Sequence, residues 1–403
     1  MRTSKGKKTI RFVFRRSGEI LVLAAGMAFL AGLDPGNGTV LAAQVSQPEG
    51  YDDEAWGRLL DDTLEYDEIP DLIEYFNPSY RSALESVEGN LQDSYDMAED
   101  MREEAKEYRQ QAKAMEDEGD AITAAQYKAM GKALQDAASS TEKALDSQKK
   151  KLDRYTLEPI RKQLASAAQS LFIGYNQMVK NQALLEKTVE LYTDMLSSSQ
   201  VQTGIGMATS TDLLSAQIEL TSAQNQLTAL NNNIDSMRRT LIMLTGWDYM
   251  DNPVIGEVPA ADVSRTDAID LEADKVTAIA YNSSLISLKN TEPDSRSLKD
   301  IHSKERSVEE AENKLRSTMD TLYNNLQEKR LALQAAETAY QQAKLTWEGN
   351  QRRYQLGMLG KTQYLGTEIQ YIQALAARDT ADMNMLQALN EYDWAVKGVA
   401  SIE

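Results

Sequence analysis

The chain has 403 residues, no cysteine, one histidine and a formal net charge of −19 at pH 7. Without cysteine there is no disulfide and no thiolate metal site, and a single histidine leaves no histidine pair to bind a metal. Nucleic-acid binding depends on Lys and Arg that neutralise phosphates, so this acidic composition argues against a nucleic-acid partner. No nucleophile-base constellation accompanies the many carboxylates, and we therefore expect neither an enzyme nor a bound cofactor or metal.

Residues 1–43 are predicted to be a secretory signal peptide. Seven basic residues precede an apolar run of 14 residues, Ile20–Leu33, and small residues follow at 40–43. The run is shorter than the roughly 20 residues of a membrane-spanning helix, and an uncleaved anchor is the alternative. Removing the seven basic and two acidic residues of this segment leaves 36 positive and 60 negative charges, a net charge of −24. We expect an exported protein.

The following residues divide into a lead-in and the first of two helical repeats. Residues 44–77 are acidic and contain Pro70, and a helix is predicted to begin at Asn77 and Pro78, with Asn as its cap. It is predicted to end near Gln111, with a break at 116–120 and a further helix to about residue 152. Pro159 then predicts a break or kink, because its ring clashes with the preceding helical turn.

A row of apolar positions recurs at an offset of 151 residues and is the strongest pattern in the chain. It runs from Leu164 to Leu196 and again from Leu315 to Trp347, with alternating spacings of four and three. Each row ends at a Gly-Met turn, at 206–207 and at 357–358, and a second row follows each turn, at 213–244 and at 364–395. Long three-four patterns are typical of paired helices in coiled coils. Gly246 is expected to end the first copy as a C-cap.

The connection between the copies is placed at residues 248–266, and a helix is expected over 267–290, with a break at 291–294. Asn77 to Gly206 spans 129 residues but Asn282 to Gly357 spans 75, so the first copy holds 54 more. We assign that surplus to an extra helical segment between about 120 and 159. The predicted units are 1–43, 44–77, 78–247 (first repeat), 248–266 and 267–403 (second repeat). The fold class is all-α, built from long antiparallel helical hairpins in two tandem repeats with coiled-coil packing.

The two turns carry apolar residues at the expected tips of the hairpins. Glycine permits the positive φ of a tight reversal, and Ser210, Thr211 or Thr362 is expected to cap the outgoing helix. One reading is that the tip residues only close the core of their own hairpin. Because an apolar tip occurs in both copies, the other reading is a docking surface. Its candidate residues are Gly206, Met207, Ala208, Gly357, Met358 and Leu359.

These turns and their downstream helices resemble the TolC-like outer membrane efflux protein family. The similarity covers most of residues 70–400, including the Asn77 and Asn282 repeat openings. It is carried by Gly206-x4-Thr211-Asp212-Leu213-Leu214-x-Ala216, by Gly357-x4-Thr362-x-Tyr364-Leu365, by the rows through Ala223 and Ala374, and by Leu241-x2-Leu244-x-Gly246.

The resemblance implies an efflux or secretion duct: a homotrimer whose helices form an extracytoplasmic tunnel. It implies tips that dock a membrane-fusion-type adaptor of the periplasm, which works with an inner-membrane pump. The outgoing helices would line the constricted end, where Asp212 and its equivalent Gln363 are the candidate constriction residues. The location implied is the cell envelope, at the outer membrane.

One part of the family pattern is missing from the sequence. Membrane strands need roughly 9 to 11 residues that alternate apolar and polar. Residues 112–160 and 290–310, where the family places them, are rich in Ala, Lys, Glu, Asp and Gln. We therefore expect the β-barrel strands to be absent, which would make a cell-surface or extracellular location the alternative. The alternative function is a secreted structural or adhesive coiled coil that transports nothing.

Overall fold

From residue 51 on, the lead-in is folded against the helices in the computed structural model, which describes residues 47–48, 51–207, 209–292 and 297–400. The predicted signal peptide and Ala208 lie outside the described residues. The lead-in contains α2 (Asp53–Leu59), β1 (Thr63–Leu64) and α3 (Ile69–Phe76). Its apolar side chains form the largest core cluster with α6 (Glu158–Gly204) and with the ends of α7 (Ser210–Leu244) and α11 (Lys361–Trp394). The members of this cluster include Trp56, Leu64, Ile69, Ile73, Phe76, Phe172, Leu241 and Trp394.

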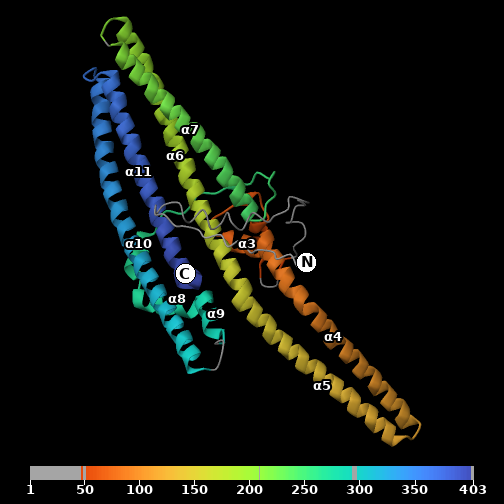
Figure 1. Cartoon of the computed structure of the whole chain (residues 1–403). Coiled ribbons are helices and arrows are strands. Elements are labelled where there is room, and N and C mark those ends of the chain that lie inside the picture. The colour runs from red at the N-terminus through yellow and green to blue at the C-terminus, as the bar shows by residue number, and fades with distance from the viewer. Residues whose placement is uncertain (1–46, 49–50, 208, 293–296, 401–403) are drawn as a thin grey trace, which may run out of the picture. The chain divides into compact units, whose positions relative to one another are not determined.

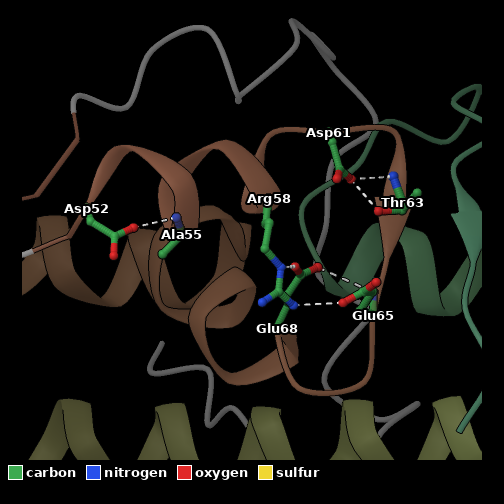
Figure 2. Close-up of polar contacts among 7 residues, drawn as sticks. All are labelled: Asp52, Ala55, Arg58, Asp61, Thr63, Glu65 and Glu68. Atoms are coloured by element: carbon green, nitrogen blue, oxygen red, sulfur yellow. Dashed lines mark hydrogen bonds and ion pairs between the residues drawn. The ribbon is translucent and has the colours of Figure 1, made fainter.

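The connection between the repeats pairs with this lead-in. β1 forms a parallel two-stranded sheet with β2 (Val254–Ile255), in which Thr63 is the partner of Val254 and Leu64 of Ile255. Figure 2 shows the polar side of the lead-in, where Arg58 donates to Glu65 (2.7 Å) and contacts Glu68 (3.0 Å). Glu68 is buried, and that burial raises the pKa of its carboxyl above the usual range even though Arg58 opposes the shift. The lead-in is thus fastened to the body by apolar packing and strand pairing.

Two long helices follow and form the first hairpin, α4 (Pro78–Asp117) and α5 (Ala121–Leu152), drawn in orange and yellow in Figure 1. Asn77 caps α4 and Pro78 occupies its first turn, as predicted, and Gly119 has the positive φ of the reversal. Beyond Tyr80, the buried positions of this hairpin fall at intervals of seven residues: Leu91, Ala98, Ala105 and Ala112 in α4, and Ala124, Gly131, Ala138 and Leu145 in α5. Apart from Leu91 and Leu145, these residues are Ala or Gly, which lets the two backbones approach closely.

The helix runs on past Pro159 without a reversal. Residues 153–157 form a π-helical segment, in which Glu158 donates its backbone N–H to the carbonyl of Asp153, five residues earlier. Pro159 has no N–H to offer the preceding turn, and the wider π turn accommodates its ring. α6 (Glu158–Gly204) continues directly from it. The break or kink expected at Pro159 is therefore a local π segment.

The rest of the first repeat follows the prediction, and the start of the second differs from it. α7 (Ser210–Leu244) is followed by its C-cap Thr245 and then by Gly246, whose φ of 93° reverses the chain after the helix. A 3-10 segment, η4 (Val263–Ala268), precedes α8 (Leu271–Tyr281) and α9 (Ser283–Asn290). The prediction of a single helix over 267–290 is thus wrong. Asn282 has extended ψ and caps α9, which ends α8 and starts a new helix.

The second repeat ends in the blue hairpin of Figure 1, formed by α10 (Leu298–Gln355) and α11 (Lys361–Trp394). Aromatic rings stack between its helices, Trp347 on Tyr371 at 4.7 Å and Tyr354 on Tyr364 at 4.8 Å. A second π segment, η5 (Ala395–Val399), follows. The long helical hairpins and the near absence of strands in the described residues confirm the all-α prediction. Residues 112–160 and 290–310 are helical apart from the turn at 118–120 and residues 291–297, of which 293–296 are not described.

Helices of different repeats pack on one another through α6 and α11. Near the turns, Leu191 of α6 lies against Leu365, Ile369 and Ile372 of α11. Further from the turns, Ile173 of α6 contacts Met383 and Leu386 of α11. α6 also packs on α7, and α11 on α10. Both α6 and α11 thus have helical neighbours on two sides.

The same polar clamp joins the start of each repeat to its end. Asn77 accepts from the N–H of Tyr80 (2.8 Å) and donates to the carbonyl of Leu244 at the end of α7 (2.6 Å). Asn282 accepts from the N–H of Leu285 (2.9 Å) and donates to the carbonyl of Ala400 beyond α11 (2.7 Å). Each Asn is 1% exposed. The clamp explains why the two predicted repeat openings begin with asparagine.

A glycine packs beside each clamp. Gly246 and Gly398 have φ of 93° and 95°, and a Cβ on them would overlap the backbone of Phe76 and of Tyr281, the residues before each Asn. Glycine is required at both positions by conformation and by space. In the part of the chain that the structure describes, no helix is long and apolar enough to cross a membrane, and no cluster of three or more acidic or histidine side chains could hold a metal.

Candidate functional site: hairpin tips and open helix faces

The tips of the α6–α7 and α10–α11 hairpins have the same backbone construction. In the first, the backbone N–H of Gly206 donates to the carbonyl of Thr203, and that of Met207 donates to the carbonyl of Gln202, across the end of α6. In the second, the backbone N–H of Gly357 donates to the carbonyl of Tyr354, and that of Met358 donates to the carbonyl of Arg353. Both glycines have positive φ, 76° and 68°, and both have open space around them. This is the Schellman pattern, and it satisfies the last carbonyls of each incoming helix.

The described apolar residues of the tips are exposed, with the exception of Leu359. Met207 is 78% exposed and Met358 is 68% exposed, whereas Leu359 is half-buried. Ile205 beside Met207 and Leu356 beside Met358 are exposed as well. Flexible, polarisable methionine side chains are frequent at surfaces that bind protein partners. Neither Met closes the core of its own hairpin.

The residues that cap the outgoing helices are not the expected ones. Thr209 caps α7 and Gly360 stands at the cap of α11, in place of Ser210, Thr211 or Thr362. Asp212 completes a capping box, since its carboxylate accepts from the N–H (2.9 Å) and the hydroxyl (2.8 Å) of Thr209. These two bonds hold the pKa of Asp212 below its ordinary value. Gln363 is exposed and has no such role.

The two tips touch each other. Gln202 at the end of α6 lies 3.5 Å from the hydroxyl of Thr362 at the start of α11, and Lys361 forms an ion pair with Asp194 (3.5 Å). The predicted docking residues of both copies, Ala208 aside, therefore belong to neighbouring tips.

Sequence reasoning missed an open row of residues on α7. The row repeats the three-four spacing on a face away from α6, and we call it the α7 seam. Leu214 and Ile218 in it are more than half exposed. Its members are all exposed and uncharged: Leu214, Ile218, Thr221, Asn225, Thr228 and Asn232.

A matching row, the α10 seam, lies on α10. Leu331 and Leu345 in it are 66% and 70% exposed, although leucine is ordinarily a core residue. Its members are again exposed and uncharged: Leu331, Ala335, Thr338, Gln342, Leu345 and Gly349. Ile218 and Leu345 both lie 12 residues from the glycine of their turn, Gly206 or Gly357.

Several positions of each seam are the repeat-equivalents of residues in the interface between α6 and α11. Adding 151 to the first three positions of the α7 seam gives Leu365, Ile369 and Ile372, the α11 residues that pack on α6. Subtracting 151 from Ala335 and Gln342 of the α10 seam gives Leu184 and Leu191, the α6 residues of the same cluster. One chain thus shows this interface filled once and left open once. The signal in the sequence is a second, uncharged three-four row on each of the two helices.

Comparison with known proteins finds a likeness to this chain only among solved structures. No family model matches it, and no curated protein matches it. Among solved structures it is similar to the outer membrane channel CmeC of Campylobacter jejuni, with 13% identity over 66% of this chain and 68% of that one, and a TM-score of 0.42. It is also similar to CusC (15% identity, 80% and 97%, TM-score 0.44) and to the outer-membrane channel OprN (10% identity, 90% and 96%, TM-score 0.48).

These structures are of the class that the sequence resemblance predicts.

Proposed function

We propose that this protein is the duct component of an efflux or secretion system, in which several copies close a helical tunnel outside the cytoplasm. The observation that carries the proposal is the pair of open seams on α7 and α10. Since one chain offers both halves of the contact, a second copy can place its α10 on the α7 of the first, in the way α6 packs on α11. Such a head-to-tail contact generates a ring when its rotation closes.

The seams suit burial in an assembly. They expose four large apolar side chains at Leu214, Ile218, Leu331 and Leu345, and they hold no charge that burial would desolvate. The family resemblance supplies the number of copies, three. The proposed site in the cell is the envelope.

The paired tips are proposed as the surface that docks an adaptor of the membrane-fusion type, which in turn couples to an inner-membrane pump. Exposed Met207 and Met358 on adjacent tips support this role. Asp212 and Gln363, one turn into the outgoing helices, are the proposed constriction residues.

A charge placed in the seams tests the assembly. Ile218→Lys or Leu345→Glu alone should reduce the mass of the purified mature protein to that of one chain, because each buries an unpaired charge. The double variant should recover the oligomer, because the two positions lie at equal distances from their turns and can pair. Ala129→Lys, on the exposed face of α5, is the control and should leave the mass unchanged. A monomeric wild type, or an oligomer in both single variants, would refute the closure.

Docking is tested separately on the tips. Met207→Asp or Met358→Asp should abolish capture of the adaptor while the oligomeric mass is retained, because a carboxylate cannot be desolvated against an apolar partner. Ala183→Asp, on an exposed position of α6, is the matched control. If both Met variants capture the adaptor as the wild type does, the tips are not the docking surface, and the secreted coiled-coil alternative gains support.

A further inference from the structure

The exposed residues of α11 have an unusual composition. After Lys361, they are Thr362, Gln363, Gln370, Gln373, Ala377 and Asn384. None is charged, although 26% of the chain is Asp, Glu, Lys or Arg. From Gln363 onward the spacing of seven, three, four and seven places them on one face of the helix. We call this face the neutral stripe.

α11 does carry charged residues, but on its packed sides. Arg378 lies over the ring of Tyr340 on α10 (4.6 Å) and pairs with Asp379 (2.5 Å). Asp382 is half-buried, and burial raises the pKa of its carboxyl. The charged residues of α11 thus lie on its packed sides, and its exposed stripe is neutral. A solvated helix ordinarily has its charged residues on the exposed face.

The first repeat carries part of the same stripe on α7, in the half of the stripe away from the tip. The equivalents of Gln373, Ala377 and Asn384 are Ser222, Gln226 and Asn233, which are exposed and uncharged too. The equivalents of Gln363 and Gln370 are Asp212 and Glu219, so carboxylates occur only toward the tip. By contrast, the exposed positions of α6 include Glu186 and Glu190 in its tipward half.

Neither seam covers this stripe. α11 is flanked by α6 and α10, and its exposed face lies between those two contacts. Closing the α7 and α10 seams with further copies leaves the stripe open, so it faces either the passage or the outside. The outside of a strongly acidic exported protein is kept soluble by charge, as on α6, which favours the passage for the neutral face.

We infer that the neutral stripe of α11 and the neutral part of its α7 equivalent line the passage, and that the passage carries hydrogen-bonding solutes without net charge. This inference rests on the proposed duct. Amide and hydroxyl side chains donate and accept hydrogen bonds, whereas a wall without fixed charge does not concentrate ions of either sign. The fixed charges on this wall are the carboxylates of Asp212 and Glu219, near the tip of α7.

The chain has no cysteine, so single cysteines can report local accessibility and charge. Gln373→Cys places a thiol on the stripe, and Thr193→Cys places one on exposed α6 beside Asp194. The purified oligomer is treated with neutral, cationic and anionic methanethiosulfonates of equal size, and with a bulky polyethylene glycol maleimide. Rates are normalised to those of free cysteine.

The Gln373→Cys variant should react with all three small reagents at equal normalised rates and should be protected from the bulky maleimide. The Thr193→Cys variant should prefer the cationic over the anionic reagent by roughly three- to tenfold, as a surface potential of about one kT predicts, and should react with the bulky reagent. A cation preference at Gln373→Cys equal to that at Thr193→Cys would refute the neutral wall. Equal reaction of both variants with the maleimide would refute its location in the passage.

The mass of the same samples separates this inference from the proposed function. A monomer would refute the duct and the passage together. An intact oligomer with either of the contrary labelling results would refute the inference alone.

Discussion

The clamp at Asn77 permits a quantitative prediction about how a repeat is closed. The perturbation is Asn77→Ala, which removes two hydrogen bonds from a side chain that is 1% exposed. One bond caps α4 through the N–H of Tyr80, and the other satisfies the carbonyl of Leu244 at the end of α7. The substitution should therefore loosen two helix ends that are 167 residues apart in the sequence.

The magnitude follows from the two bonds. Loss of an N-cap costs about 1 kcal/mol. A carbonyl left without its donor in a partly buried place costs about 1–3 kcal/mol. Together they lower the free energy of opening this joint by about 2–4 kcal/mol, or roughly 30- to 700-fold in its opening equilibrium. Asp120→Ala is the matched control, since Asp120 caps α5 on the surface and its variant should cost only about 1 kcal/mol.

Hydrogen exchange of the amides at the start of α4 and the end of α7 measures this opening in the intact mature protein. Asn77→Asp keeps the cap acceptor but loses the donor to Leu244, so both helix ends should still exchange faster than in the wild type. If Asn77→Asp is protected like the wild type, or if Asn77→Ala is no worse than Asp120→Ala, the clamp does not join the repeat ends.

Three further predictions concern the clamp glycines, the tip and the first hairpin. Gly398→Ala should lower the free energy of unfolding by well over the roughly 1 kcal/mol that a positive φ costs, because the added Cβ overlaps Tyr281. Gly206→Ala, in open space, should lower it by only that amount, and urea unfolding compares the two variants. The folded-state pKa of Asp212 lies below the ordinary value of 3.8, so the capping box stabilises the tip above that pH and weakens as the pH falls through the folded pKa. Proteolysis at the α6–α7 turn should therefore increase in the wild type as the pH falls through that range. The Asp212→Asn variant should show no such pH step. Ala105→Leu, at a buried position that is 2% exposed, should destabilise the α4–α5 hairpin by about 1–3 kcal/mol, while Ala129→Leu on its exposed face should change little, as thermal unfolding would report.

The sequence by itself predicted the features that depend on local patterns. The three-four rows determined the long helices, because one helix face must meet a neighbour every turn. Gly206, Gly357 and Gly246 marked reversals and a helix end, since each requires positive φ. Asn77 and Asn282 were visible as repeat openings because capping is a property of a few adjacent residues.

The tertiary structure decided what those local patterns meet. The acidic lead-in supplies the largest core, because Trp56 and Phe76 find α6 and the ends of α7 and α11 far away in the sequence. The helix expected over 267–290 divides at Asn282, whose side chain bonds to the far end of the repeat. Thr209 caps α7 in place of its neighbours, since its backbone is the one left extended. Whether a three-four row is covered or exposed depends on the presence of a partner helix. The spacing in the sequence does not distinguish the two cases, because it is the same in both. That difference, between α6 on α11 and the open seams of α7 and α10, is what points to other copies of the chain.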